Sequence, residues 1–581
     1  MNISNHSPSG PRTIAEILQT RADARPDELA FCFLINGEEE GPRLTHAALD
    51  RAARAIAATL RDIAEPGERA ILLYEAGLEF IPAFFGCLYA AIVPVPLAPP
   101  RAGRVTQSWQ VLASVIADCQ ARLVLATGDL AASLAKGFEN FPGGDQVRWL
   151  ATDQIDGSHA RRWREPGIKE DTLALLQYTS GSTAMPKGVM VSHRNLMHNE
   201  SMIKTAVAHD GPLFGVTWLP LHHDMGLIGG VLQRMFYGDM PMFLMSPLGM
   251  LQKPVRWLQA MSRYRANTTL APNFAYDLCV DRIRPEEKAA LDLSHWSVAF
   301  IGSEPISART MERFSEAFAP CGFRAETFYP CYGLAEATLL VTGGSEGDRP
   351  FVRTVSVEAL AQGEVVAERA DAPDARRLVG CGRPWLDQRV VIVHPETRVR
   401  LPPGKVGEIW VAGASVAQGY WNRPDETERT FRACFSDTGE GPWLRTGDLG
   451  FLEDDQLFIT GRIKDVIVIR GGNYYPQDIE ATVQAVHPGL RLNCGAAFET
   501  GPDGQPRLIV VQELARRCGD VDLTKLRGEI RKAVADRHGL HVDDIHFLEP
   551  GSVLKTSSGK IQRHACRAGY ERGVLRAWRG T

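Results

Sequence analysis

The stretch YTSGSTAMPKG at residues 178–188 decides the fold assignment, because it packs glycines, small hydroxyl side chains and one lysine into a short span. Glycines let backbone N–H groups come close to oxygen atoms, and hydroxyls and a lysine add further donors, which suits a phosphate. Apolar runs flank the stretch, TLALLQ before it and GVMVSH after it, so we expect a loop between two strands. A flexible Ser/Gly turn is the plainer alternative for such a composition.

The spacing within this stretch excludes two common nucleotide-binding loops. A P-loop requires G-x-x-x-x-G-K-[ST], but counting from Gly181 the second glycine position holds Pro186, and Lys187 is followed by Gly188. The chain contains no G-x-G-x-x-G, so a Rossmann dinucleotide site has no support either. The phosphate chemistry must therefore belong to another class.

Composition and charge narrow the class of protein. The chain has 581 residues and a net charge of −5, which argues against a strongly basic nucleic-acid-binding protein. Its eleven cysteines include no C-x-x-C pair, as is typical of buried thiols in a reducing compartment. The first residues show no basic start followed by an apolar run, so we expect no signal peptide and a cytoplasmic protein.

One long uncharged segment, from Phe80 to Pro100, could be either a membrane-spanning helix or a buried part of the core. It is about as long as a membrane helix, but it contains five prolines, which a continuous membrane helix would not tolerate. We predict a buried helix followed by a short core segment rich in Val and Pro, and no membrane span.

The order of apolar runs predicts an α/β fold of several parts. Strand-like runs alternate with helical patterns through the first 460 residues, which indicates layered α/β subdomains with largely parallel sheets. Short strands from about 386 to 460 predict a small β-rich subdomain, and 343–380 has the polar, mixed-charge character of an insertion or an elaborate surface loop. We therefore expect an N-terminal domain over 1–460, a junction at 461–465, and a small α+β C-terminal domain over 466–581.

Six motifs in order resemble the adenylate-forming enzymes, the superfamily of acyl-CoA synthetases, luciferases and peptide-synthetase adenylation domains. The phosphate-loop stretch is the first of them. The others are YGLAEAT (332–338), LRTGDLG (444–450), GRIKD (461–465), IRGGNYYPQDIE (469–480) and LKTSSGKIQR (554–563). The resemblance covers the chain from roughly residue 10 to 567, and it implies that the C-terminal domain is mobile.

Within that superfamily the chain looks most like the fatty acyl-AMP ligases. The segments that carry this likeness are LPLHHDMGLIG (219–229), LAPNFAYDLC (270–279), FYPCYGLAEATL (328–339) and the insertion at about 343–380. The insertion matches the element that separates these ligases from acyl-CoA synthetases. Two positions depart from the family pattern, which often has Tyr in place of His222 and Arg in place of Gly472; the second departure affects a contact on the mobile domain.

The resemblance assigns roles to individual residues. The catalytic cation between the substrate carboxylate and the α-phosphate would be Lys560, which offsets the repulsion of two anions. By itself a lysine in such a polar loop would simply be solvated. The glutamate of YGLAEAT, Glu336, would be the Mg²⁺ ligand, and Lys464 of GRIKD would be the hinge. The residues implied to bind the nucleotide are Thr179, Ser180, Gly181, Ser182, Thr183, Lys187, Gly302, Ser303, Tyr332, Gly333, Asp448 and Arg462.

The sequence His222-His223-Asp224 permits several interpretations. It contains metal-ligand types, but adjacent residues rarely converge on one ion. The H-H-x-x-x-D-G motif of condensation-type acyltransferases fails, because Leu227 stands at the required aspartate position. By resemblance, His223 lies at the mouth of the acyl pocket, close to the substrate carboxylate. The apolar residues that follow could line an acyl tunnel or belong to the ordinary core; they are Met225, Leu227, Ile228, Val231 and Leu232.

The resemblance implies a two-part reaction. A medium- or long-chain fatty acid would react with ATP·Mg²⁺ to give an acyl-adenylate and pyrophosphate, and the acyl group would pass to the phosphopantetheine thiol of a carrier protein. That carrier would be a separate acyl carrier protein or a polyketide or peptide synthase acting in trans. A long-chain fatty acid–CoA ligase shares the same core motifs and is the main alternative. A catalytically inactive binding module is disfavoured because Lys187, Glu336, Asp448 and Lys560 are all present.

The basic end of the chain, from residue 560 to 581, has two interpretations. It holds six Lys or Arg residues against one acid, Glu571. A solvated face is the favoured explanation, and a landing surface for an acidic carrier protein is the alternative.

Overall fold

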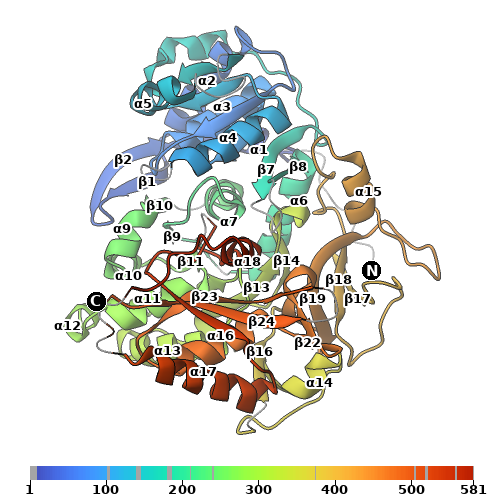
Figure 1. Cartoon of the computed structure of the whole chain (residues 1–581). Coiled ribbons are helices and arrows are strands. Elements are labelled where there is room, and N and C mark those ends of the chain that lie inside the picture. The colour runs from blue at the N-terminus through green and yellow to red at the C-terminus, as the bar shows by residue number, and fades with distance from the viewer. Residues whose placement is uncertain are drawn as a thin grey trace.

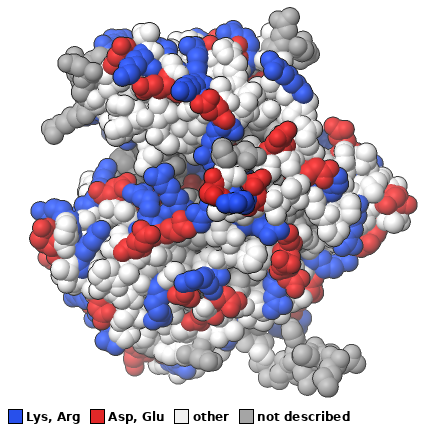
Figure 2. All heavy atoms as spheres, turned by 90° about the horizontal axis from the view of Figure 1, so that it is seen from below, with Lys and Arg blue, Asp and Glu red and all other residues white. Residues whose placement is uncertain are grey.

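The structure is a computed structural model, and it describes residues 10–579 except 101–104, 139–145, 180–185, 210, 239–240, 373–374, 503–505, 517, 519–520 and 557–558. Figure 1 shows an upper α/β layer, a larger α/β body below it, a β-rich part at one side and the C-terminal domain across the front. Over the described surface seen in Figure 2, Lys and Arg are interspersed with Asp and Glu rather than gathered in one field.

A four-stranded parallel sheet with the order β4-β3-β5-β6 forms the upper layer. Successive strand residues face opposite sides, so Ala70 and Leu72 pack in the same core as α2 and α3, while Ile71 and Leu73 pack with α4 and α5. Both faces are covered, which explains the nearly unbroken apolar runs in these strands. The elements are α2 (His46–Arg61), β3 (Arg69–Leu73), α3 (Phe80–Ala90), β4 (Val93–Leu97), α4 (Val105–Cys119), β5 (Leu123–Ala126), α5 (Gly128–Phe138) and β6 (Arg148–Ala151).

The uncharged segment at 80–100 forms part of this layer. Helix α3 is buried along its length, and β4 pairs in parallel with β3. The predicted buried helix and Val-Pro-rich core segment are confirmed. Within the described residues, no helix has the length and apolar character needed to cross a membrane.

The body contains an eight-stranded sheet with the order β14-β13-β12-β11-β9-β10-β1-β2, parallel from β13 to β1 and antiparallel at both edges. Helices α10, α11 and α13 cover one face, and α6 with the helical segment after residue 223 covers the other. The strands are β1 (Leu29–Ile35), β2 (Glu39–Thr45), β9 (Gly215–Thr217), β10 (Met242–Met245), β11 (Thr268–Ala271), β12 (Val298–Ile301), β13 (Phe328–Gly333) and β14 (Leu340–Gly343), and the helices are α6 (His193–Val207), α10 (Val255–Arg263), α11 (Asn273–Arg282) and α13 (Ala308–Phe318).

The predicted β-rich subdomain is a four-stranded antiparallel sheet, β17-β18-β19-β20. Its strands are β17 (Arg389–Val393), β18 (Gly407–Ala412), β19 (Leu444–Glu453) and β20 (Gln456–Arg462), and helix α15 (Pro424–Phe431) lies between β18 and β19 in the chain. The pairing of β19 with β20 sets Asp448 directly opposite Arg462. Two of the motifs are therefore neighbours across one strand pair.

The segment at 343–380 is more regular than the predicted surface loop. Strands β15 (Val352–Ser356) and β16 (Ala375–Val379) form an antiparallel pair, with helix α14 (Val357–Ala361) after the first strand. Val355, Leu360 and Leu378 are buried against Phe451 and Phe458 of the β-rich sheet. Each apolar run here is short and interrupted by charges, so the sequence showed no period.

The C-terminal domain is built on a three-stranded sheet, β23-β24-β25, in which β24 pairs antiparallel with β23 and parallel with β25. Leu526, Ile530 and Val534 of α17 are buried in its core, as their spacing predicted, and α17 ends at Gly539 with φ +64°. The elements are β21 (Ile467–Ile469), β22 (Gly472–Tyr474), α16 (Pro476–Ala485), β23 (Leu490–Thr500), β24 (Arg507–Leu514), α17 (Leu523–His538), β25 (Asp544–Leu548) and α18 (Arg563–Glu571).

Candidate active site

The predicted phosphate loop joins two antiparallel strands, β7 (Leu173–Thr179) and β8 (Lys187–Ser192). Thr179 and Lys187 face each other across the base of this hairpin, which supports the predicted loop between strands. The predicted residues Ser180, Gly181, Ser182 and Thr183 lie outside the described residues. At Gly188 an added Cβ would lie 2.9 Å from the ring of Tyr178, so the pairing at the base requires glycine.

Side chains from three other elements hold the two stems of this loop. The Tyr178 hydroxyl donates to Oδ2 of Asp118 in α4 at 2.6 Å, and Arg423 Nη2 lies 3.0 Å from Oδ1 of the same carboxylate. Lys187 Nζ lies 2.5 Å from Glu426 Oε2 and 5.0 Å from the ring centroid of Tyr420. The predicted phosphate-binding lysine is thus held between an acid and an aromatic face.

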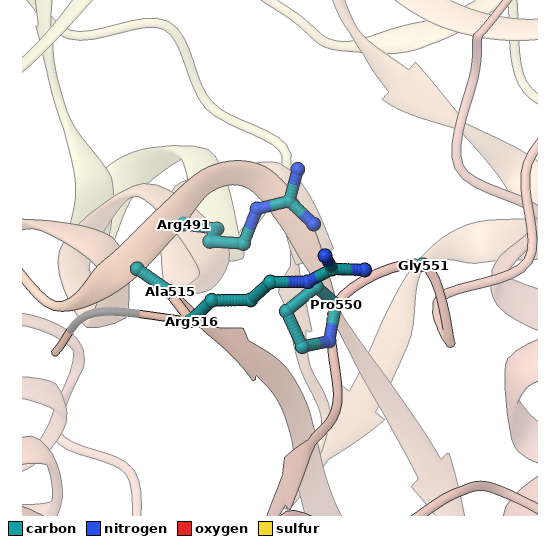
Figure 3. A pocket seen from close by; sticks show the side chains of 5 residues that line it. All are labelled: Arg491, Ala515, Arg516, Pro550 and Gly551. Atoms are coloured by element: carbon teal, nitrogen blue, oxygen red, sulfur yellow. The ribbon is translucent and has the colours of Figure 1, made fainter. Parts of the chain in front are cut away.

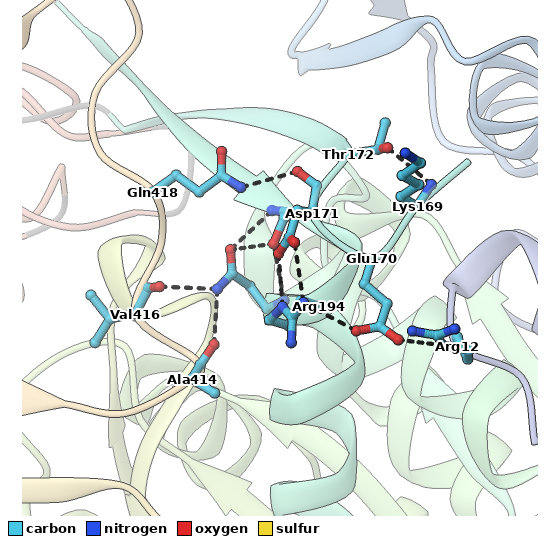
Figure 4. Close-up of polar contacts among 11 residues, drawn as sticks. Arg12, Lys169, Glu170, Asp171, Thr172, Arg194, Ala414, Val416 and Gln418 are labelled. Carbon is cyan, nitrogen blue, oxygen red and sulfur yellow. Dashed lines mark hydrogen bonds and ion pairs between the residues drawn. The ribbon is translucent and has the colours of Figure 1, made fainter. Parts of the chain in front are cut away.

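A charged network fixes the segment that enters β7 (Figure 4). Arg194 of α6 donates from Nε and Nη2 to the two carboxylate oxygens of Asp171 at 2.7 and 3.1 Å. Its Nη2 also lies 3.2 Å from Glu170 Oε2, and Glu170 pairs in turn with Arg12. Gln418 Nε2 donates to the Asp171 carbonyl at 3.1 Å. Exposed pairs contribute little individually, but together these contacts join α6, β7 and the loop that carries Gln418.

Three of the predicted nucleotide-binding residues are in direct contact. The Tyr332 hydroxyl donates to Asp448 Oδ2 at 2.7 Å, and Arg462 Nε donates to Asp448 Oδ1 at 2.6 Å. Burial raises the pKa of Tyr332 well above its ordinary value, and the negative charge of Asp448 adds to this. Asp448 also raises the pKa of Arg462. Both oxygens of this carboxylate are therefore fixed, one by Arg462 of the paired strand and the other by Tyr332, which lies 116 residues away in the sequence.

Glu336 lies in a short 3₁₀ turn, Ala335–Ala337, directly after β13. The Tyr420 hydroxyl donates to its Oε1 at 2.8 Å, and its backbone carbonyl accepts from the Ala417 N–H at 2.9 Å. A magnesium ion usually takes only one or two protein carboxylates and completes its shell with water and phosphate. A single glutamate fixed by Tyr420, whose ring also faces Lys187, fits that requirement.

Lys560 reaches this site from the C-terminal domain. Burial lowers the pKa of its ammonium group, and the nearby carboxylates of Asp224 and Glu304 oppose that shift. Both Arg462 and Asp448 also act on it electrostatically, so the side chain lies among the residues of the N-terminal part. The backbone beside Lys560 also lies close to the N-terminal part, since a Cβ added at Gly559 would lie 3.6 Å from the ring of Phe274.

His223 and Asp224 form a pair at the start of the helical segment after β9. His223 Nδ1 lies 2.7 Å from Asp224 Oδ1, and the backbone N–H of Met225 donates to the same oxygen at 2.7 Å. Burial by itself would raise the pKa of Asp224, but His223 and Lys560 outweigh it and lower that pKa. Among the described residues there is no group of three or more His, Cys, Asp or Glu that could hold a metal, so the His-His-Asp sequence gives no metal cluster there.

The apolar residues that follow divide between two cores. Met225 packs with Leu270, Phe300 and Leu340, and it accepts a hydrogen bond from Ser303 Oγ to Sδ at 3.3 Å. The other four residues of the predicted tunnel lining belong to the main core, and they are Leu227, Ile228, Val231 and Leu232. They lie in a π-helical turn, Leu227–Leu232, a geometry found often at functional sites. Met225 is thereby placed beside the predicted site residue Ser303.

Gly302, Ser303 and Gly333 lie where two adjacent parallel strands, β12 and β13, end or pass into loops. Ser303 has φ +70°, an uncommon backbone conformation for a residue with a side chain. An added Cβ at Gly333 would lie 1.8 Å from the Leu339 carbonyl oxygen, so this position accepts only glycine. Ligands of open α/β sheets bind at the carboxyl ends of the strands, which is where these residues lie.

The predicted hinge residue, Lys464, is exposed in a 3₁₀ turn, Ile463–Asp465, between β20 and β21. Asp465 of the same turn pairs with Arg563 at 3.3 Å, and Arg563 also holds Glu480 at 2.7 Å. The first pair links the junction to the C-terminal domain, and the second connects α18 with α16 inside that domain.

The insertion makes direct polar contacts with the C-terminal domain. Arg376 Nε of β16 lies 3.1 Å from Asp478 Oδ1 of α16, and its guanidinium carbon lies 4.7 Å from the ring centroid of Tyr475. Arg537 of α17 donates to the Ala375 carbonyl at 3.2 Å. A movement of the C-terminal domain away from β16 would break these contacts.

Sequence reasoning missed several residues of this site. Glu304, Glu426 and Tyr420 were not predicted, although each touches or faces a predicted residue. Glu304 directly follows the predicted pair Gly302 and Ser303, so its position offered a signal. The other two lie more than eighty residues from the groups they contact, and no local pattern marks them.

Two families of known proteins match the chain. Residues 18–421 match the family described as AMP-binding enzyme. Residues 464–579 match the family described as Disco-interacting protein 2-like, AMP domain.

Individual proteins are similar over nearly the whole length. The medium-chain-fatty-acid–[acyl-carrier-protein] ligase JamA of Moorena producens is 45% identical over 572 residues, covering 97% of this chain and 96% of that protein. The long-chain-fatty-acid–AMP ligase FadD32 of Mycolicibacterium smegmatis is 37% identical over 610 residues, covering 98% and 96%. The crystal structure of a fatty acyl-adenylate ligase from L. pneumophila in complex with acyl adenylate and pyrophosphate gives a TM-score of 0.75 at 40% identity, covering 97% and 96%.

Proposed function

The chain belongs to the AMP-binding enzyme family, and from this premise we propose that it is a fatty acyl-AMP ligase that serves a carrier protein. It activates a medium- or long-chain fatty acid with ATP, releases pyrophosphate, and passes the acyl group to the phosphopantetheine thiol of a separate acyl carrier protein or synthase. The relatives named as carrier-protein and AMP ligases support this substrate and acceptor. The observation that carries the proposal is the position of Lys560 among Asp224, Glu304 and Asp448.

In the first step a carboxylate oxygen of the fatty acid attacks the α-phosphorus of ATP, and the bond from that phosphorus to the pyrophosphate oxygen breaks. Both reactants are anions, so a cation between them lowers the barrier, and Lys560 provides it. His223, oriented by Asp224 through Nδ1, turns its other ring nitrogen to the substrate carboxylate. Holding the reactants in line contributes about 7–11 kcal/mol through proximity.

The remaining residues hold the nucleotide. Asp448 accepts hydrogen bonds from the ribose hydroxyls while Arg462 keeps the carboxylate in place. The ring of Tyr332 lies against adenine, with Gly302, Ser303 and Gly333 at the adjacent strand ends. Thr179, Lys187 and the loop residues Ser180, Gly181, Ser182 and Thr183 bind the phosphates that leave as pyrophosphate.

In the second step the thiol attacks the acyl carbonyl carbon and AMP leaves. We place this step after a rotation of the C-terminal domain, residues 466–581, about Lys464 in the junction 461–465, with 1–460 as the fixed part. Two contacts between the insertion and the C-terminal domain, Arg376 with Asp478 and Arg537 with the Ala375 carbonyl, oppose a free rotation. Restricted rotation is our explanation for an acceptor that is a carrier protein rather than free CoA.

A direct experiment tests the proposed function. The enzyme is incubated with ATP, Mg²⁺ and a series of fatty acids, and CoA and a panel of holo-carrier proteins are offered separately. We expect fatty-acid-dependent pyrophosphate release and acylation of a carrier, with little acyl-CoA. Efficient formation of acyl-CoA would instead establish the alternative, a long-chain fatty acid–CoA ligase.

We propose Mg²⁺ as the metal, held by Glu336 together with the phosphates. Glu336→Gln should raise the Mg²⁺ concentration needed for half-maximal adenylation about tenfold, because one charged ligand is lost. Tyr420→Phe, which removes the hydroxyl that fixes Oε1, should give a smaller rise. The matched control is Glu326→Gln, since Glu326 is paired with Arg349 away from the site. An unchanged Mg²⁺ dependence in Glu336→Gln would show that this residue is not the ligand.

The role of the insertion can be tested at one residue. Arg376→Ala removes the ion pair with Asp478 and the contact with Tyr475. If that contact restrains the domain, acyl-CoA formation should rise about tenfold, since about 1.4 kcal/mol corresponds to that factor. Arg369→Ala in the same insertion is the control, because Arg369 is highly exposed and its ion pair among the described residues is the local one with Asp371. Equal CoA activity in both variants would contradict the proposed restraint.

A further inference from the structure

A cavity on the C-terminal domain carries two arginines and has no part in the proposed chemistry (Figure 3). It has a volume of about 400 Å³ and is lined by Arg491, Ala515, Arg516, Pro550 and Gly551, which we call the arginine pocket. The side chains of Arg491 and Arg516 run alongside each other, with both guanidinium groups directed to the same side of the pocket. Two cations that face one cavity create a site for an anion.

Each wall of the arginine pocket is held in place by the fold. In β23 the pairing slips between Leu490 and Gly495, so that Arg491 lies in a bulge, and its carbonyl accepts from Gln512 Nε2 at 2.8 Å. The turn at Pro550 and Gly551 is fixed by Arg576, which donates to the Gly551 carbonyl at 3.2 Å. Bulges often re-aim a side chain at a functional position, and here the bulge directs Arg491 to the pocket.

The chemistry of the pocket is that of carboxylate recognition. Arg491 already pairs with the carboxylate of Glu513, a residue only 1% exposed. Arg516 is exposed and has no ion-pair partner among the described residues. The described lining therefore brings two arginine side chains to the pocket, with the buried Glu513 paired to one of them. Guanidinium groups bind carboxylates in a planar, two-bond geometry.

The pocket also lies at the end of the sheet from which the catalytic loop departs. Strands β24 and β25 run parallel, so their carboxyl ends, at Ala515 and Pro550, lie at the same edge. The second oxygen of Glu513 accepts from the Val553 N–H at 2.8 Å, at the start of the loop that leads to Lys560. A partner held at the arginine pocket would therefore be attached beside the loop that enters the active site, and it would travel with the mobile domain.

We propose that the arginine pocket is the docking site for acidic side chains on the surface of the carrier protein that receives the acyl group. This inference rests on the proposed function and names the surface that its acceptor uses. The occupant is a protein carboxylate cluster because Arg491 already binds a carboxylate and because the cavity is larger than one side chain needs. Arg516 supports the same choice, since it is exposed at this cavity and has no ion pair with any residue that the structure describes.

The test uses the full-length enzyme and one charge reversal, Arg516→Glu. The control is Lys532→Glu, which makes the same change at an exposed position of α17 in the same domain. Three rates are measured: fatty-acid-dependent ATP–pyrophosphate exchange, acyl transfer to the best holo-carrier of a panel, and acyl transfer to free pantetheine, which carries the thiol without the protein. Arg491 is left intact, because its loss would leave the Glu513 carboxylate buried and unpaired.

We expect Arg516→Glu to raise the KM for the holo-carrier about tenfold, with exchange and pantetheine transfer unchanged, because opposed charges are replaced by like charges at one surface. Arg516→Lys should restore most of the loss. A KM for the carrier no higher than that of Lys532→Glu would overturn the inference. An equal loss of acyl transfer to pantetheine would also overturn it, because the effect would then concern the thiol group rather than the protein surface of the carrier. Failure of the wild-type enzyme to acylate any carrier, or to form the adenylate, would instead contradict the proposed function.

Discussion

Lys560→Ala should lower the rate of fatty-acid-dependent ATP–pyrophosphate exchange by about 10²–10³-fold, the usual loss when one preorganised donor to a developing charge is removed. The ammonium lies among Asp224, Glu304, Asp448 and Arg462. It is the group that the C-terminal domain contributes to this cluster, and it stabilises the negative charge that builds up between carboxylate and phosphate. The fold should be unaffected, because the loop is held by its own backbone contacts between Thr556 and Lys560.

The matched control for this prediction is Lys555→Ala in the same loop. Lys555 is exposed, and its Nζ lies 3.4 Å from Cys494 Sγ within the C-terminal domain. Exchange should stay near the wild-type rate in this variant. A second measurement separates the two steps: with synthetic acyl-adenylate supplied, Lys560→Ala should still transfer the acyl group to the carrier. Exchange at the wild-type rate in Lys560→Ala would show that another group stabilises the transferring phosphorus.

Asp448→Ala should lower kcat/KM for ATP by about 10²–10⁴-fold, because two hydrogen bonds to a charged group are lost and each contributes about 1.5–3 kcal/mol. The loss extends beyond the ribose. Without the carboxylate, Arg462 has no partner at 2.6 Å and the Tyr332 hydroxyl has no acceptor at 2.7 Å. We therefore expect both KM and kcat to change, since the ring of Tyr332 and the guanidinium group of Arg462 both lose the contact that positions them.

The control for Asp448 is Asp437→Ala, which removes an exposed aspartate from the same β-rich subdomain. Steady-state kinetics with ATP as the varied substrate should match the wild-type enzyme in that variant. Thermal unfolding of both variants shows whether the pair with Arg462 also stabilises the sheet. If Asp448→Ala kept its ATP kinetics, the ribose of the bound nucleotide would have to lie elsewhere.

The sequence was sufficient for the elements of the fold because their signals are local. The apolar spacing of α17, the glycine at residue 539 and the alternation of strands and helices each depend on neighbours within a few residues. The hairpin at 352–379 was missed because its buried residues, such as Val355 and Leu378, find their partners in β19 and β20, about a hundred residues away.

The site residues could be predicted only through the family resemblance, because the contacts among them join residues that are far apart in the sequence. Asp448 and Tyr332 are 116 residues apart in sequence, and neither residue type at its position implies the other. Glu304 and Asp224 face Lys560 across a domain boundary, so their proximity depends on how two domains are oriented. Such contacts come from tertiary arrangement rather than from propensity or period, and the structure was needed to find them.

The central claim is that a carboxylate oxygen of the fatty acid attacks the α-phosphorus of ATP. Fatty acid labelled with ¹⁸O in its carboxyl group, ATP and a holo-carrier are incubated with the enzyme, and the phosphate products are analysed by mass spectrometry. The account predicts one ¹⁸O atom in AMP and none in pyrophosphate, because the attacking oxygen stays on the α-phosphorus when the thiol displaces AMP. Label in orthophosphate with ADP as the co-product, or unlabelled AMP, would contradict it.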